Sequence, residues 1–140
     1  MIHNLIMHNQ LQPADVIVAK KRTGLGRILN HYIVYAGGYS FLGNLQDGVK
    51  PISHYELNTL LQEYEPVKIR RFSGTEFQRR LALRRAYSRL GEKYSLLNFN
   101  CEHFANWVQK GKENSTQVAV ALTVLAISVI FKLINNETEK

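Results

Sequence analysis

Cysteine is almost absent from the sequence, since Cys101 is the only one in the chain. A lone thiol excludes an intrachain disulfide and makes reactivity the leading question about this residue. No cysteine cluster with the spacing of metal ligands is present, so we expect neither a metal nor a cofactor. The glycine-containing turn at 23–26 lacks the remaining spacing of a dinucleotide or P-loop fingerprint, which argues against a phosphate cradle.

The sequence also lacks a secretory signal and a nucleic-acid-binding motif. The segment 1–10 has neither a basic region nor a continuous apolar stretch, so we expect no secretory signal. No recognisable nucleic-acid motif accompanies the basic residues, and we expect no nucleic-acid partner. What is present is the composition of one folded domain, with 140 residues of which 45% are apolar and 21% charged.

Positive charge is concentrated in one part of the chain. The net charge is +7; residues 1–65 carry five Lys/Arg against five Asp/Glu, whereas residues 66–112 carry eleven against three. One predicted helix presents an arginine-rich face that suits the phosphates of a lipid surface, although an ordinary solvated face fits equally well. The arginines of this face are Arg79, Arg80, Arg84, Arg85 and Arg89.

Alternating and β-branched residues predict an antiparallel sheet, and capping boxes predict helices. The strands are expected at 15–21, 31–35, 39–42, 49–52 and 67–72. Capping boxes at 53–56 and 73–76 begin helices that end near Glu63, before Pro66, and near Leu90. The second of these helices has candidate core positions at Phe77, Leu81, Ala86, Tyr87 and Leu90. A third helix begins after Asn100 and ends near Gly111, which gives an α+β domain with the sheet packed against helices.

The last apolar segment, 118–134, differs from the rest of the chain. Residues 118–131 carry no charge, and Lys132 lies near the end, where its side chain can reach the membrane interface. The segment is short against the ~20 residues of a typical span, and a core or oligomerisation helix is the alternative. We favour a membrane anchor. The expected organisation is an extension at 1–12, a domain at 13–112, a linker at 113–117, the hydrophobic helix at 118–134 and a polar tail at 135–140.

Cys101 occupies the first turn of the helix that follows Asn100. Unpaired backbone N–H groups and the helix dipole favour a thiolate there, whereas a buried cysteine acting as a small hydrophobe is the alternative. A cysteine nucleophile needs a base. Among the five histidines, His103 points away from Cys101 on the helix and is expected to be structural. His31 begins a predicted strand and is the best-placed candidate.

The motif Asn-Cys-Glu-His-Phe at 100–104, together with the earlier His-Tyr-Ile-Val-Tyr-Ala-Gly strand, resembles the lecithin:retinol acyltransferase (LRAT) family. These proteins are circularly permuted relatives of the NlpC/P60 cysteine peptidases, and the resemblance covers roughly residues 13–111. It implies that Cys101 is the nucleophile and His31 the general base. It also implies a phospholipid substrate and a membrane anchor in the apolar tail.

One position departs from the family pattern. Members of the family carry a second histidine about a dozen residues after the first, where this sequence has Gly43 followed by Asn44. Asn44 is the side chain assigned to orient His31, because its carbonyl oxygen can accept an imidazole N–H. Asp47 remains an alternative.

The resemblance thus predicts a phospholipid acyltransferase or phospholipase A that acts through a cysteinyl thioester. The expected location is the cytoplasmic face of a membrane, to which the tail anchors the chain. A peptidase or amidase with the same Cys-His pair is one alternative, and a non-catalytic membrane-interaction module is another.

Overall fold

The computed structural model describes residues 2–24 and 29–138. Five strands form one antiparallel sheet in the order β4-β3-β2-β1-β5. The strands are β1 (Val16–Lys21), β2 (Asn30–Gly37), β3 (Ser40–Leu45), β4 (Gly48–Ile52) and β5 (Tyr64–Arg70). The helices are α1 (Ile2–His8), α2 (His54–Glu63), α3 (Glu76–Ser88), α4 (Cys101–Lys110) and α5 (Thr116–Thr138). The α+β class is confirmed, while residues 25 and 26 of the expected turn lie outside the described residues.

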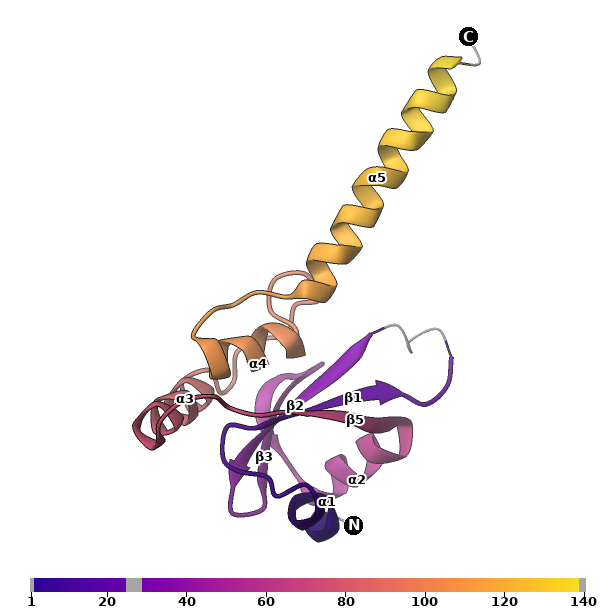
Figure 1. Cartoon of the computed structure of the whole chain (residues 1–140). Helices are drawn as coiled ribbons and strands as arrows, with labels where there is room; N and C mark the ends of the chain where they lie inside the picture. Colours follow the sequence, from indigo (N-terminus) through magenta and orange to yellow (C-terminus); the bar gives the residue numbers. More distant parts are fainter. Residues whose placement is uncertain (1, 25–28, 139–140) are drawn as a thin grey trace.

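Helices cover both faces of the sheet, with α3 and α4 on one side and α1 and α2 on the other (Figure 1). The alternation of side chains along each strand produces these two apolar layers. Val16, Val34 and Leu42 pack with Phe104 of α4, whereas Ile17 and Ile33 pack with Leu57 of α2. The central strands are therefore buried on both faces and hold their side chains rigidly.

Helix α1 is absent from the sequence-based prediction. Its seven residues are too few to form a stable helix alone, so local sequence carries little signal for it. Tertiary packing stabilises it instead, because Ile2 and Ile6, together with Leu11, are buried in the apolar layer beneath the sheet.

Strand β5 begins at Tyr64 rather than after Pro66, so the predicted start at residue 67 is wrong. Pro66 lies inside the strand opposite Ala19 of β1. β5 is the outermost strand of the sheet, and an edge strand tolerates a proline because one side of its backbone needs no partner. A bulge in the β1–β5 pairing between Val18 and Ala19 accompanies the proline.

Helix α3 starts from a different cap than the sequence predicted. Thr75 caps it and forms a capping box with Gln78, in place of the expected box at 73–76. The core positions follow the true register: Ala82 and Ala86 are buried, whereas Phe77, Tyr87 and Leu90 are exposed, so these three assignments are wrong. Small alanines let α3 pack closely against α4, and the larger side chains remain at the surface.

Some arginines of the predicted basic face contact other parts of the protein rather than solvent. Arg79 donates to the carbonyl of Pro13 at 2.5 Å, and Arg85 donates to the carbonyl of Val108 at 2.7 Å. Arg89 lies 4.4 Å from the ring centre of Trp107. Arg80 and Arg84 are exposed, so they are the two arginines of this face that extend into solvent.

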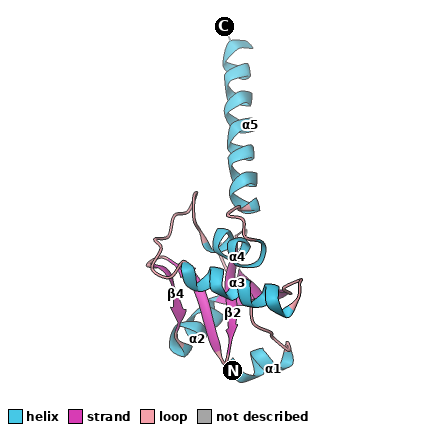
Figure 2. Ribbon diagram, turned by 90° about the vertical axis from the view of Figure 1, so that its left-hand side faces the viewer, coloured by secondary structure: helices cyan, strands magenta, loops and turns pink. Residues whose placement is uncertain are grey.

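Helix α5 projects away from the domain into open space (Figures 1 and 2). Among the described residues, α5 is the one helix long and apolar enough to cross a membrane, over Thr116–Glu137. Its most apolar stretch has a mean hydropathy of 2.3 and contains no buried residue. Its 23 residues span about 34 Å at 1.5 Å per residue, which exceeds the thickness of a bilayer core. The helix is longer than predicted, and its length is consistent with a tail anchor.

Candidate active site

The site is built at the first turn of α4, which Asn100 caps. The Asn100 side chain accepts hydrogen bonds from the backbone N–H groups of Glu102 and His103, at 2.9 and 3.1 Å. The His103 ring returns the contact, since its Nδ1 accepts from the backbone N–H of Asn100 at 3.1 Å. This capping box explains His103 as a structural residue, as expected from its position, and fixes the helix end that carries Cys101.

The thiol of Cys101 is buried, with 8% of the residue exposed. Burial raises its pKa to about 11, although the backbone N–H groups of Tyr32, Glu102 and Cys101 itself act in the opposite direction. The expectation of a low thiol pKa at the helix start is therefore wrong for the protein without substrate. The proton remains on sulphur, and Sγ lies 3.9 Å from the backbone oxygen of Asn30.

His31 lies near the start of β2, opposite Ala19 of β1. Its ring packs against Tyr64 with the ring centres 5.3 Å apart, and its Nε2 is buried without a hydrogen-bond partner among the described residues. Burial lowers the pKa of His31 to about 4. The imidazole is therefore neutral at pH 7, which is the state a general base requires.

Asn44 lies in β3 and is fully buried. Its amide nitrogen donates to the backbone oxygen of Phe99 at 2.7 Å, while its Oδ1 is buried without a partner among the described residues. The neighbouring Gly43 packs toward the opposite layer, because a Cβ built at this position would lie 2.7 Å from Ile52 Cδ1. Asn44, not residue 43, therefore faces the site.

One pocket of about 530 Å³ brings the three predicted site residues together, since His31, Asn44 and Cys101 all line it. Within the described parts of the chain, no hydrogen bond joins the thiol to the imidazole or the imidazole to Asn44. Contacts of this kind are often long before substrate binds and shorten in the complex. Asp47, the alternative to Asn44, instead pairs with Lys50 at 2.9 Å.

Among the pocket residues that were not identified from the sequence are two tyrosines. Tyr64 and Tyr94 line the pocket beside Cys101, and burial raises the pKa of both hydroxyls. Tyr64 belongs to the edge strand and Tyr94 to the loop after α3, so neither forms part of a local motif. Only the tertiary fold brings them to the thiol.

A thiol at a helix start and a neutral imidazole on the same pocket are the groups that cysteine-dependent acyl transfer uses. Residues 47–114 match the family model described as lecithin retinol acyltransferase. This match agrees, over these residues, with the resemblance seen in the sequence. The matched segment includes Cys101 but neither His31 nor Asn44.

Neither a comparison with curated proteins nor one with solved structures finds a match. The LRAT family is enzymatic, with activities of the acyltransferase or phospholipase type. It also suggests a lipid substrate.

Proposed function

We propose that this protein is a thiol-dependent phospholipid acyltransferase or phospholipase A that works at a membrane surface. Cys101 is the nucleophile, His31 the general base and Asn44 the residue that orients His31. The observation that carries the proposal is the shared pocket, which is lined both by a thiol at the start of α4 and by a neutral imidazole from β2.

The reaction begins when Cys101 Sγ attacks the ester carbonyl carbon of a phospholipid and His31 takes the thiol proton. The resulting tetrahedral oxyanion collapses, the C–O bond breaks, and the leaving lysophospholipid oxygen receives the proton from His31. The product is a thioester on Cys101. Attack by water releases a fatty acid, whereas attack by an amine or alcohol transfers the acyl group; in each case His31 accepts the proton of the attacking group, and the proton returns to the thiol.

The high thiol pKa and low imidazole pKa support proton transfer during attack rather than a preformed ion pair. With a thiol pKa of about 11 and an imidazole pKa of about 4, both groups are neutral before substrate binds. The oxyanion then needs donors. Asn100 already occupies the N–H groups of Glu102 and His103, so the backbone N–H of Cys101 is the donor we assign from the first turn.

Asn44 is part of the proposal because its Oδ1 acceptor has no hydrogen-bond partner among the described residues. Its amide nitrogen donates to the Phe99 carbonyl, which leaves Oδ1 as a buried acceptor on a residue that lines the same pocket as His31. Buried polar groups are normally hydrogen-bonded. An imidazole N–H of His31 is the partner we propose for this oxygen when substrate closes the site.

The membrane part of the proposal rests on α5 and the surface arginines. We propose that α5 anchors the chain at the cytoplasmic face of a membrane, with its apolar surface in lipid. Arg80 and Arg84 are the residues of the basic face free to meet head groups, whereas Arg79 and Arg85 are committed to backbone carbonyls of the domain. The substrate is then delivered in the plane of the bilayer.

The test is a covalent intermediate on Cys101. The full chain is reconstituted in phosphatidylcholine vesicles, quenched with acid and examined by intact mass spectrometry and peptide mapping. We expect an acyl adduct on Cys101 and its complete loss in Cys101→Ala, because the thioester cannot form without the thiol. Release of lysophospholipid by Cys101→Ala at the wild-type rate would refute the proposal, and absence of both adduct and turnover in the wild type would favour the non-catalytic membrane module.

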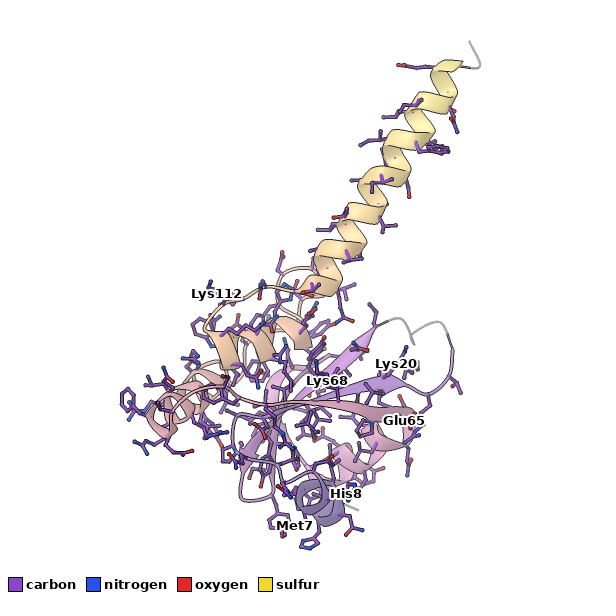
Figure 3. The ribbon with its side chains drawn as sticks, in the orientation of Figure 1. Met7, His8, Lys20, Glu65, Lys68 and Lys112 are labelled. Carbon is purple, nitrogen blue, oxygen red and sulfur yellow. The ribbon has the colours of Figure 1, made fainter. Side chains whose placement is uncertain are left out.

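His31 is tested in the same assay. His31→Ala should slow adduct formation by 10²-fold or more, since general bases contribute roughly 10²–10⁴-fold. His8→Ala is the matched control, because His8 is exposed on α1 at the end of the molecule away from α5 (Figure 3). An adduct rate unchanged in His31→Ala would remove His31 from the mechanism.

A further inference from the structure

A second, apolar cavity opens at the thiol, on the side toward α5. It measures about 170 Å³, and its walls include Cys101 and Tyr94, which also line the polar pocket. The thiol therefore lies at the junction of a polar and an apolar space. The apolar cavity is lined by Leu29, Leu96, Leu97, Val118 and Ala121, together with Asn30, Asn100 and Gln117.

The cavity continues along α5 as a wider groove of about 630 Å³. The two spaces share Leu29, Gln117 and Ala121, and the groove then follows one face of the helix through Val124 to Ser128. Leu96 and Leu97, at the rim near Cys101, are 59% and 56% exposed. A continuous apolar path thus runs from the surface of α5 to the thiol.

The first turn of α5 is fixed to the residue beside the nucleophile. The buried carboxylate of Glu102 accepts hydrogen bonds from the Ser115 hydroxyl and from the backbone N–H groups of Thr116 and Gln117, the latter two at 3.2 and 3.1 Å. A carboxylate at a helix N-terminus satisfies its free amides and complements the helix dipole. Glu102 therefore connects the position of α5 directly to that of Cys101.

A second contact ties α5 to the residue beside the proposed base. The Gln117 side chain accepts from the backbone N–H of Asn30 at 2.7 Å, and the backbone oxygen of Asn30 is the one that lies 3.9 Å from Cys101 Sγ. The first turn of α5 is thus fixed at both sides of the site, and an anchor that only tethered the domain would not require these contacts.

We propose that α5 forms one wall of the substrate site, and that the apolar cavity beside Leu96 and Leu97, together with the groove that continues along α5, holds the acyl chain of a bilayer phospholipid. The inference rests on the proposed function. A lipid acyl chain is the occupant because the path ends at the nucleophile and begins on a helix of membrane-spanning length. The ester carbonyl then lies at Cys101 while the acyl chain remains against α5, so the lipid leaves the bilayer only in part.

The test uses a substitution that fills the groove and leaves the helix apolar. In Ala121→Phe an aromatic ring projects into the space that both cavities share, about 7.5 Å along α5 from Thr116 at 1.5 Å per residue. Ala119→Phe is the matched control, since residue 119 lies two positions away, roughly 160° around the helix, and lines neither cavity. Both variants are expected to bind membranes as the wild type does, which vesicle flotation measures.

The readout is the ratio of thioester formation from oleoyl and octanoyl phosphatidylcholine, each diluted into vesicles of non-cleavable diether phosphatidylcholine. We expect Ala121→Phe to lower the oleoyl-to-octanoyl ratio about tenfold, because steric mismatch in an apolar pocket is worth 10–200-fold. Ala119→Phe should keep the wild-type ratio.

The possible outcomes distinguish the proposed acyl-chain groove from the proposed thioester chemistry at Cys101. A wild-type oleoyl-to-octanoyl ratio in Ala121→Phe, or an equal loss of thioester formation with both lipids, would overturn the proposed acyl-chain groove. The proposed function would still stand if the wild-type protein forms the thioester. A wild type that forms no thioester from either lipid would refute the proposed function and the groove together.

Discussion

Helices α4 and α5 are separated by only a short connection, 111–115, yet their surroundings are opposite. Seven of the ten residues of α4 are buried, including the charged Glu102 and the polar Asn106. None of the residues 118–134 of α5 is buried, although 14 of these 17 residues are apolar. Of these two neighbouring helices, the more apolar one is therefore the less buried.

The difference shows what each helix requires from its surroundings. In α4, the buried Glu102 carboxylate accepts from the first turn of α5, and the amide nitrogen of Asn106 donates to the Asn114 carbonyl at 2.7 Å. The Asn106 Oδ1 is buried without a partner among the described residues. In α5, Leu125, Ile127 and Phe131 are each 60% or more exposed. Apolar surface of this extent is unfavourable in water and marks an interaction with a partner or a membrane. A lipid environment accounts for an apolar surface on every side of α5.

The strongest test of this comparison places charge in the middle of α5. The double variant Val124→Lys/Ile127→Lys should lose binding to neutral phosphatidylcholine vesicles, because a lysine at the centre of a span costs about 2.5–3.5 kcal/mol. Vesicle flotation of the full chain measures the effect. Val67→Lys on β5, at a residue that is 53% exposed, is the control and should float as the wild type does. Unchanged flotation of the double variant would remove the membrane interpretation of α5.

The next test replaces one phenylalanine by alanine in each of the two helices. Phe104→Ala in α4 should lower the free energy of unfolding by about 3–5 kcal/mol, because it leaves a cavity in a fully packed layer. Phe131→Ala in α5 should change it by less than about 0.5 kcal/mol, since this ring is 66% exposed and packs against no part of the domain. Denaturant unfolding of the full chain in mild detergent compares the two. Equal losses would mean that α5 contributes to the folded core.

The smallest predicted effect concerns the single thiol. Because burial raises the pKa of Cys101 to about 11 from an ordinary value of 9.0, the native thiol should be alkylated by iodoacetamide with a midpoint well above pH 9. Two pKa units correspond to about 2.7 kcal/mol, or about 100-fold less thiolate than in the unfolded chain at pH 8. The rate measured with and without denaturant checks this, and the unfolded chain is its own control because no other cysteine reacts.

The sign of the pH effect on stability follows from the same shift. A folded-state pKa above the unfolded value contributes stability that is fully present below pH 9 and is lost as the pH rises toward 11. A native alkylation midpoint at or below pH 8.5 would show that the helix-start N–H groups outweigh burial, and would restore the preformed thiolate that the sequence suggested.

Local signals predicted the elements that depend on local interactions. The cap at Asn100, the end of α4 at Gly111 and the capping box of Ser53 with Glu56 are all found where the sequence placed them. One error was itself local, since the cap of α3 is the capping box of Thr75 with Gln78 rather than the box expected at 73–76. The other depended on tertiary pairing, because Pro66 lies in an edge strand that β1 pairs with on one side only. The site followed the same division, since Cys101 lies in a recognisable motif while Tyr64 and Tyr94 reach it only through the fold.

The sequence by itself determined the lone thiol at a helix start, the histidine near the beginning of a central strand and the apolar helix at 118–134, because each depends on residue type and spacing. Only the tertiary structure decided that burial outweighs the helix dipole at Cys101, that Asn44 faces the pocket while Gly43 faces Ile52, and that Glu102 and Asn30 hold α5 beside the thiol. These features depend on which distant surfaces meet, and spacing along the chain carries no information about desolvation at a contact formed across 70 residues or more.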